Sequence, residues 1–343
     1  MPNPVLTRAI DRLASREDLS AEDMAAVLAE IMAGNATETE TAAVLIALRT
    51  KGETIDELVG LASTMRRFAA PVKTGRDDLI DTAGTGGGRQ TFNVSTTAAL
   101  IAAGAGCAVA KHGNRSATGL SGSADVLEAL GVRIDLAPDA VARCIEQVGF
   151  GFMFAPAHHG ATRFVVPVRK ELAVRTIFNF LGPLTNPAGA TRQVIGVSDP
   201  AFLDVIAGAL ARLGARRALV VSSADGLDEL STAGATRVVE VNGAELRSYE
   251  VTPEQVGLER AAYEDVAGGP PDANAETARR IFAGERGPAR DLAVLNAGAA
   301  IYAAGRVDGL EPGVRAAEAA IDAGAASEAL DRLVELTSKL APV

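Results

Sequence analysis

Two glycine-rich polar loops place the strongest constraint on the fold of this chain. The first reads DTAGTGGGRQTFNVST over residues 81–96 and follows the apolar pair Leu79 and Ile80. The second reads KHGNRSATGLSGSAD over residues 111–125 and follows the apolar stretch 108–110. Each loop leads into a helical pattern, so flexible glycines and the free N–H groups of a helix N-terminus would face a bound anion. Two such loops on neighbouring strands predict a site for one ligand with two anionic groups, such as a sugar carrying a phosphate and a diphosphate.

A simpler interpretation of the first loop is that its glycines mark turns and its hydroxyls cap helices. The loop does not fit the dinucleotide fingerprint, because the last required glycine after Gly84 and Gly86 is replaced by Arg89. It does not fit a P-loop either, because no lysine followed by serine or threonine closes it. The motif alone therefore predicts phosphate binding without identifying the phosphate.

From residue 77 onward, short apolar stretches alternate with helical patterns, which predicts an α/β domain with a mostly parallel central sheet covered by helices. The predicted strands are 79–81, 108–110, 132–134, 152–154, 193–197, 218–221 and 237–241, with 245–249 as a late antiparallel edge strand. Residues 250–285 are predicted to be a polar surface connection with one short helix near 275–282. The predicted closing helices are 291–304, 314–323 and 326–340.

The first part of the chain predicts a small helical bundle over residues 1–72, followed by the larger domain over 73–343. Helix-start patterns recur at 20–23, 37–40 and 54–57, and glycines stand where two helices should stop, at Gly34 and Gly52. The last predicted helix, 55–68, is expected to expose Arg66 and Arg67. Residues 156–190 carry no strand pattern.

The composition excludes several classes of function. The 343 residues include 33 Lys+Arg and 43 Asp+Glu, a net charge of −10, which disfavours nucleic acid as a partner. No apolar run reaches the roughly 20 residues that span a bilayer, and the start MPNP is not typical of a signal segment. We therefore expect a cytoplasmic protein without a membrane partner. Cys107 and Cys144 fit no metal motif and are expected to be reduced packing residues.

Adjacent carboxylates at Asp228 and Glu229 follow the predicted strand 218–221 and a turn at 224–226. Ligands of open α/β sheets bind at the carboxyl ends of strands, and Mg²⁺ prefers oxygen ligands. The same residues also fit a solvated acidic turn without any metal.

The whole set of motifs resembles the anthranilate phosphoribosyltransferase family, whose pattern is a GTGGD loop, NxST, KHGNR and SGSxD. This chain has GTGG at 84–87, NVST at 93–96, KHGNR at 111–115 and SGSAD at 121–125. The resemblance continues through FAP at 154–156, His159, PVR at 167–169, RTIFNFLGPLTNP at 175–187 and DGLDE at 225–229. It implies transfer of the 5-phosphoribosyl group from 5-phosphoribosyl 1-diphosphate (PRPP) to anthranilate, the second step of tryptophan biosynthesis from chorismate. The products would be N-(5-phosphoribosyl)anthranilate and pyrophosphate.

The resemblance also implies the residues of the site. PRPP would bind Gly84, Thr85, Gly86, Gly87, Gly88, Thr91, Asn93, Val94, Ser95, Thr96, Lys111, His112, Gly113, Asn114, Arg115, Ser116, Ala117, Thr118, Gly119 and Ser123. Anthranilate would bind Gly84, Asn114, His159 and Arg169. Ser95, Asp228 and Glu229 would hold Mg²⁺, with two ions per subunit. Lys111, Asp228 and Glu229 would stabilise the transition state, whereas His158 is expected at the surface. The helical bundle would form a homodimer contact, and residues 165–190 would return to it as a hinge.

Two departures from the family pattern concern the substrate pockets. Gly88 replaces the usual aspartate, and the loop is one residue shorter before Asn93, so we expect weakened or rearranged PRPP binding. Residues 160–163 read GATR where PAMK is common, which affects the shape of the aromatic pocket. The alternatives are a pyrimidine-nucleoside phosphorylase-like enzyme, which would need no Asp-Glu metal pair, and a non-catalytic nucleic-acid-binding relative, which would need a basic groove.

Overall fold

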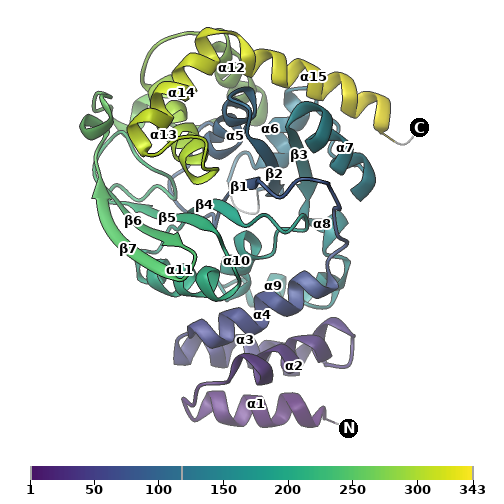
Figure 1. Ribbon diagram of the computed structural model, residues 1–343. Helices are drawn as coiled ribbons and strands as arrows, with labels where there is room; N and C mark the ends of the chain where they lie inside the picture. Colours follow the sequence, from purple (N-terminus) through teal and green to yellow (C-terminus); the bar gives the residue numbers. More distant parts are fainter. Residues whose placement is uncertain (1, 117–118, 342–343) are drawn as a thin grey trace.

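A computed structural model describes residues 2–116 and 119–341 of the chain. Its N-terminal part is a bundle of helices, drawn in purple to blue at the bottom of Figure 1. These helices are α1 (Pro4–Ala14), α2 (Ala21–Met32), α3 (Glu38–Lys51) and α4 (Ile55–Phe68). The predicted helix starts are confirmed, because the side chains of Ser20, Thr37 and Thr54 each accept a hydrogen bond from the backbone three residues later.

The expected exposure of Arg66 is wrong. Its side chain is half-buried, and its Nε donates to the carbonyl of Leu184 at 2.7 Å. Burial lowers the pKa of this guanidinium. Arg67, its neighbour in the sequence, is exposed as expected. Arg66 therefore joins the bundle to a segment more than a hundred residues away.

The larger domain is built on a seven-stranded sheet within the described residues, in the order β3-β2-β1-β4-β5-β6-β7. The strands are β1 (Leu79–Gly84), β2 (Ala108–Gly113), β3 (Phe150–Phe154), β4 (Arg192–Gly196), β5 (Arg217–Ser223), β6 (Thr236–Asn242) and β7 (Glu245–Val251). The pairings from β3 through β5 are parallel, and β7 is the predicted antiparallel edge strand. β6 is antiparallel as well, since the connection 224–235 contains no helix that could return the chain for a parallel pairing.

The predicted strand at 132–134 is wrong. These residues connect α6 (Ser123–Ala129) to α7 (Pro138–Val148) and have no strand partner in the described part of the chain. Val132 and Ile134 are buried, and the N–H of Arg133 donates to Thr337 Oγ1 of the last helix at 3.2 Å. Their alternating apolar pattern reflects packing under a helix, which the sequence does not distinguish from pairing in a sheet.

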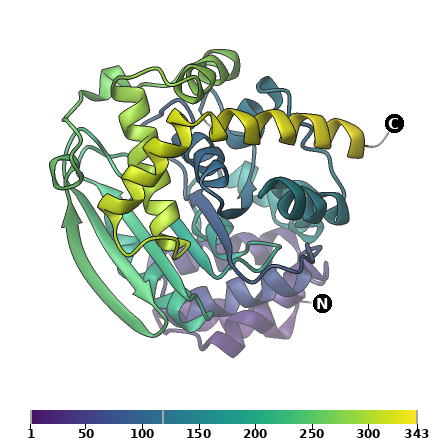
Figure 2. The same cartoon turned by 45° about the horizontal axis from the view of Figure 1, so that its top comes forward.

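Helices cover both faces of the sheet (Figure 1). One face packs against α5 (Val94–Gly104), α12 (Pro271–Phe282), α13 (Pro288–Ala303), α14 (Leu310–Asp322) and α15 (Ala325–Leu340). Figure 2 shows the yellow C-terminal helix α15 lying across this side. The other face packs against α11 (Leu203–Arg212), and the same buried core continues without a break into the helical bundle. Successive residues of one strand enter different cores, as Val194 and Ile195 do.

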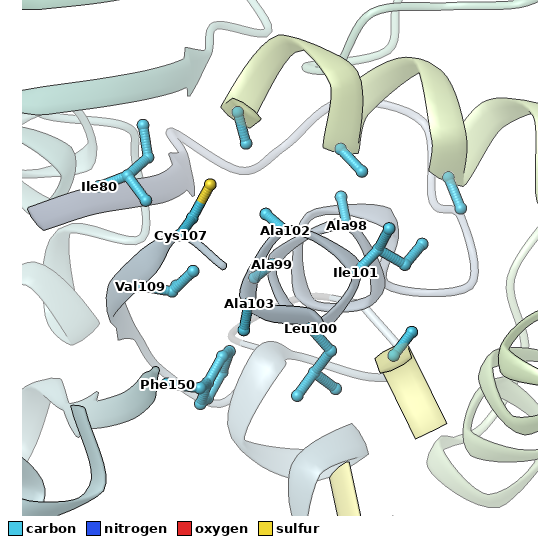
Figure 3. Packing of buried hydrophobic residues seen from close by; sticks show 14 of the residues in the cluster. Ile80, Ala98, Ala99, Leu100, Ile101, Ala102, Ala103, Cys107, Val109 and Phe150 are labelled. Atoms are coloured by element: carbon cyan, nitrogen blue, oxygen red, sulfur yellow. The ribbon is translucent and has the colours of Figure 1, made fainter. Parts of the chain in front are cut away.

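The helix that follows the first glycine loop is buried on all sides. In α5 every residue from Ala98 to Ala103 is buried, and Figure 3 shows them packed among Ile80, Val109 and Phe150. Small side chains allow neighbouring helices to approach closely: a Cβ at Gly104 would lie 2.8 Å from the backbone nitrogen of Ala326. The dense core therefore fixes the N-terminus of α5 at the end of β1.

Residues 155–190 contain no strand, as expected, and consist of short helical turns. These are α8 (Ala155–His158), η1 (Gly160–Phe164), α9 (Val166–Leu172), α10 (Phe178–Leu181) and η2 (Gly182–Leu184). Val165, Val168 and Phe178 share the core of the helical bundle. The expected surface position of His158 is wrong, since it is 1% exposed with Nδ1 3.1 Å from the carbonyl of Ala70.

The remaining short turns are η3 (Pro200–Phe202), η4 (Pro253–Val256) and η5 (Tyr263–Asp265). Cys107 and Cys144 are buried and unpaired, consistent with packing residues. Among the described residues, none of the helices combines the length and the hydropathy that crossing a membrane requires.

Candidate active site

The first glycine loop closes directly over the Asp228 side chain. Gly86 N donates to Asp228 Oδ2 at 2.9 Å, and Arg89 N donates to the carbonyl of Gly226 at 3.1 Å. A Cβ would lie 2.8 Å from Asp228 Oδ2 at Gly84 and 2.7 Å from Asp228 Oδ1 at Gly88. A side chain at either position would have to displace the carboxylate or the loop. The structure thus brings together two motifs that lie about 140 residues apart in the sequence.

Ser95, Asp228 and Glu229, the predicted metal ligands, line one small cavity of about 20 Å³ between the ends of β1, β4 and β5. Burial, together with the charge of Asp228, raises the pKa of Glu229 to about 8. Burial also raises the pKa of Asp228. Burial makes it unfavourable for both carboxylates to be ionised at the same time. A bound divalent cation would stabilise the ionised form of both side chains.

The donor set fits Mg²⁺ with incomplete protein coordination. No group of three or more His, Cys, Asp or Glu side chains is placed to hold a metal within residues 2–116 and 119–341. Two carboxylates and a hydroxyl leave open positions, and Mg²⁺ ordinarily fills such positions with water and substrate phosphates. The residues therefore suit an ion that arrives with a phosphorylated ligand better than a permanently enclosed one.

Lys111 lies beside Thr82 and Ser95, two residues that line this cavity, and is 1% exposed. Its Nζ donates to the carbonyl oxygen of Thr82, and it lies 3.3 Å from Thr82 Oγ1 and 3.5 Å from Ser95 Oγ. Burial lowers the pKa of Lys111, and the charges of Asp81 and Glu229 oppose that shift. In this position the ammonium compensates the charge of the buried carboxylates.

Asp81 connects the two loops beneath the site. It accepts hydrogen bonds from His112 N at 3.1 Å and from Asn186 Nδ2 at 2.7 Å. Burial raises its pKa to about 6. These contacts fix the end of β2 beside the end of β1, so both loops open toward the same edge of the sheet.

Asn93 precedes α5 directly but does not cap this helix with its side chain. It has a left-handed backbone with φ of 64° and makes no side-chain bond to the helix N-terminus. Asn93 Oδ1 accepts from Ser121 Oγ at 2.8 Å and from Asn274 Nδ2 at 2.8 Å, and Asn93 Nδ2 donates to the carbonyl of Ser121 at 3.0 Å. The N–H groups of Val94 and Ser95, at the start of α5, therefore donate no hydrogen bond to the side chain of Asn93.

Asn274 is a site-supporting residue that sequence reasoning missed. It is 2% exposed, and its Oδ1 accepts from Gly269 N at 2.8 Å. The hydroxyl of Tyr263 donates to the carbonyl of Gln90 at 2.7 Å, and Arg89 stacks on the Tyr263 ring with its Cζ 3.6 Å from the centroid. Residues 250–285, predicted as a surface connection, thus hold the first loop. No local pattern in the sequence signals these contacts.

The second loop is organised by its own residues. Asp125 accepts from Gly122 N at 2.8 Å and from Ser116 N at 3.2 Å, and it pairs with Arg115 at 2.8 Å. Arg115 also pairs with Glu128 at 2.5 Å, so its charge is balanced by two carboxylates. Gly119 N donates to Ser116 Oγ at 2.7 Å.

Some predicted PRPP ligands occupy less accessible positions. Thr91 forms an isolated antiparallel β-bridge with Ala267. The Oγ1 of Thr96 is buried and has no hydrogen-bond partner among the described residues. Gly113 lies where a Cβ would be 3.1 Å from the Cβ of Ser123. Ala117 and Thr118 lie outside the described residues.

A pair of buried histidines lies beside the second loop. The rings of His112 and His159 are 5.0 Å apart, and His112 Nδ1 is 3.1 Å from the carbonyl of Gly182. Burial lowers the pKa of His112 to about 3 and that of His159 to about 4, so both rings are neutral at pH 7. The Nε2 atoms of both rings are buried and have no partner in the described part of the molecule. Buried polar atoms of this kind require an explanation such as a ligand or a water.

Arg169 provides an uncompensated positive charge on α9. It is half-buried over the ring of Phe178, with its Cζ 5.6 Å from the centroid. Burial lowers its pKa, and within the described residues no side chain forms an ion pair with it. Asn114, another of the four predicted anthranilate residues, is exposed at the end of β2, where its Oδ1 accepts from Arg115 N at 2.8 Å. A half-buried guanidinium without a partner suits a carboxylate ligand.

The two parts of the chain match two parts of one enzyme class. Residues 76–327 match the "Glycosyl transferase family, a/b domain", and residues 7–69 match the "Glycosyl transferase family, helical bundle domain". The fold and the site thus define a glycosyl transferase with a helical bundle. A relative from Rubrobacter xylanophilus, an anthranilate phosphoribosyltransferase, is 51% identical over 98% of this chain and 99% of its own. The chain belongs to the anthranilate phosphoribosyltransferase family.

Solved structures of that family have the same fold. Anthranilate phosphoribosyltransferase from Thermus thermophilus is 47% identical, with a TM-score of 0.92 over 96% of this chain and 99% of its own. The enzyme from Saccharomyces cerevisiae, solved in complex with PRPP and Mg, is 26% identical, with a TM-score of 0.89 over 98% of each chain. The yeast enzyme was also solved in complex with 4-fluoroanthranilate.

Proposed function

We propose that this protein transfers the 5-phosphoribosyl group of PRPP to the amine of anthranilate, giving N-(5-phosphoribosyl)anthranilate and pyrophosphate. The observation that carries the proposal is the closure of the first glycine loop on the turn that holds Asp228 and Glu229. That contact places anion-binding backbone beside a pair of carboxylates suited to Mg²⁺, as an activated diphosphate donor requires. Membership of the family supplies the acceptor.

The diphosphate side of the site works through charge and position. Backbone amides of the first glycine loop other than those of Thr85 and Gly86, together with the N-terminus of α5, would bind phosphate oxygens. Lys111 would supply positive charge from beneath. Ser95, Asp228 and Glu229 would hold Mg²⁺, which neutralises the departing diphosphate when bound. The described site contains no paired nucleophile and base, so the rate enhancement would come from positioning and from electrostatic stabilisation of the leaving group.

The acceptor side would use Arg169 for the carboxylate of anthranilate, with Asn114 and Gly84 beside it. Both histidines stay neutral at pH 7, and the unpartnered Nε2 of His159 is available for a polar group of the acceptor. A neutral pocket wall leaves the aromatic amine unprotonated and nucleophilic. The amine attacks C1 of the ribose as the C1–O bond to the diphosphate breaks, and the proton of the amine leaves to solvent or to the pyrophosphate.

The proposal extends to the assembly of the protein and to its location in the cell. We propose a cytoplasmic homodimer formed through the helical bundle of residues 1–72, with two Mg²⁺ ions per subunit. Residues 165–190, which share the core of the bundle, would act as the hinge between it and the domain over 73–343. Anthranilate and PRPP are the proposed small-molecule partners, without nucleic acid or membrane.

The test is the loss of anthranilate fluorescence on addition of PRPP, with and without Mg²⁺. We expect consumption of anthranilate that requires PRPP and is fastest with Mg²⁺. A nucleoside-phosphorylase activity would instead release a base from a pyrimidine nucleoside with inorganic phosphate and without anthranilate consumption. Absence of anthranilate consumption at saturating PRPP and Mg²⁺ would overturn the proposal.

A further inference from the structure

The tip of the first glycine loop is held by an arginine from the segment between α9 and α10. Arg175 Nη2 donates to the carbonyl of Gly86 at 3.0 Å and to Ser198 Oγ at 2.8 Å. Ser198 Oγ in turn donates to the same carbonyl of Gly86 at 3.0 Å. The guanidinium lies flat against Gly87, where a Cβ would be 3.1 Å from Nη2.

The other side of Gly86 is bound to the proposed metal ligand. Its N–H donates to Asp228 Oδ2 at 2.9 Å, while its carbonyl accepts from Arg175 and Ser198. Gly86 has φ of 68°, a conformation that favours glycine and that lets the two groups face opposite partners. Residue 86 is therefore clamped between the carboxylate and the guanidinium.

Arg175 is also tied to the helical bundle. Arg49 of α3 donates from Nη1 to the backbone carbonyl of Arg175 at 2.6 Å. Contacts thus run without a gap from α3 through Arg175 and Gly86 to Asp228. Arg49 itself touches only the backbone of Arg175 in this series.

We propose that Arg175 is a positioning residue that holds the first glycine loop at the separation from Asp228 that the donor diphosphate requires. Because Arg49 holds Arg175 from the bundle, the position of the loop then depends on the position of the bundle. Arginine suits this role, since its Nη2 bonds two acceptors while the planar face of the guanidinium packs on a glycine. The expected effect of Arg175 on PRPP binding rests on the proposed function. The effect of Arg175 on the position of the loop does not depend on any activity.

A direct role is the competing explanation, in which Arg175 binds the diphosphate and only rests on Gly86 in the free protein. The two roles differ in what remote changes do. If Arg175 positions the loop, Ser198→Ala and Arg49→Gln disturb the loop although neither change removes the guanidinium. If Arg175 binds the donor directly, only changes of Arg175 itself affect PRPP.

The test combines hydrogen–deuterium exchange of the substrate-free protein with steady-state kinetics. In Arg175→Gln and Ser198→Ala, we expect amide exchange of a peptide covering residues 84–91 to rise at least about fivefold, and about twofold in Arg49→Gln. The Michaelis constant for PRPP should rise about tenfold in Arg175→Gln with little change in turnover or in the constant for anthranilate. Arg175→Lys should recover less than half of the loss, because an ammonium lacks the planar face that packs on Gly87.

Arg143→Gln is the matched control. Arg143 is exposed on α7, outside both glycine loops and outside the segment that carries Arg175, and it should change neither measurement. A raised Michaelis constant for PRPP without faster exchange in residues 84–91 would overturn the positioning role in favour of direct binding. Unchanged exchange and unchanged kinetics in Arg175→Gln would overturn it altogether. If the unaltered protein consumed no anthranilate, the proposed function would fail, while the exchange result would still decide whether Arg175 holds the loop.

Discussion

The two glycine loops have similar composition but are held in different ways. The second loop is organised largely by its own residues, because Asp125 bonds Ser116 and Gly122 and pairs with Arg115. Its contacts with the first loop include the bonds between Ser121 and Asn93. The first loop is held by residues from distant parts of the chain, among them Asp228 and Asn274. A loop held by distant residues can respond to changes elsewhere in the fold, whereas a locally organised loop keeps its shape.

The charge around the two loops also differs. The first loop ends beside carboxylates whose pKa values are raised, Asp228 and Glu229. The second loop begins at His112, whose pKa is lowered, as is that of His159 beside it. One side of the site therefore needs a cation, and the other side is a neutral, buried wall.

The largest expected effect concerns the histidines. The pKa values of about 3 for His112 and about 4 for His159 lie below the usual value of about 6.5, so the unfolded chain binds protons that the folded one does not. The contribution of these histidines to the free energy of unfolding is therefore fully present above pH 6.5. It is lost as the pH drops below 6.5 toward their pKa values in the folded protein. At pH 5 each histidine should destabilise the fold by about 2 kcal/mol relative to neutral pH.

The measurement is urea unfolding at pH 7.5 and pH 5 for the unaltered protein and for His112→Asn and His159→Asn. Each variant should lose less stability between the two pH values than the unaltered protein, by about 2 kcal/mol. Since the chain has three histidines, ring titration by NMR can follow each one directly. Equal losses in all three proteins would contradict the neutral pair.

The next effect concerns the carboxylates of the first loop. Replacing both Asp228→Asn and Glu229→Gln should lower turnover at saturating Mg²⁺ by at least about tenfold, a loss of roughly 1.4 kcal/mol or more in the barrier. The fold should not be weakened, because burial already disfavours the ionised form of both side chains. Asp204→Asn, which removes an exposed carboxylate paired with Arg237 at 2.9 Å, is the control. Near-normal turnover in the double variant would contradict a metal-binding role.

Much of the fold could be predicted from the sequence because its signals are local. Thr37 and Thr54 each stand three residues before a glutamate, and both form the capping boxes that this spacing predicts. The apolar stretches before the two glycine loops are neighbouring parallel strands, β1 and β2. The strand predicted at residues 132–134 is wrong because burial under a helix and pairing in a sheet produce a similar alternation of apolar and polar residues.

The contacts that shape the site could not be predicted in the same way. Asn274 and Ser198 lie in stretches without a motif, and their roles arise only when the chain brings them to the first loop. His158 and Arg66 were expected at the surface because the sequence does not show that folding brings their side chains against the backbone carbonyls of Ala70 and Leu184. The assignments of PRPP, anthranilate and metal ligands remain predictions that binding experiments can test.

Gly88 offers a sharper test of the first loop. A Cβ there would lie 2.7 Å from Asp228 Oδ1 and 2.9 Å from the backbone nitrogen of Asp228, so any side chain should push the loop away from the turn. Gly88→Ala should raise the Michaelis constant for PRPP about tenfold. Gly88→Asp adds the carboxylate of the family pattern to the same steric change and should raise it less. Gly234→Ala, where a Cβ meets no atom within 4 Å, is the control.

The two substitutions at Gly88 separate space from charge. If Gly88→Ala leaves the Michaelis constant unchanged, contact with Asp228 does not set donor binding. If alanine and aspartate raise it equally, the family's carboxylate contributes nothing in this chain.

The smallest effect is expected in the second loop. Asp125→Asn keeps the shape of the side chain and can still accept one hydrogen bond, but it weakens the bonds from Ser116 N and Gly122 N and removes the ion pair with Arg115. The Michaelis constant for PRPP should rise about threefold, since a locally organised loop loses one of several supports. Amide exchange should rise in residues 113–122 and stay unchanged in residues 84–91. Faster exchange in the first loop as well would mean that the two loops are mechanically coupled, and the contrast between a locally held and a distantly held loop would not hold.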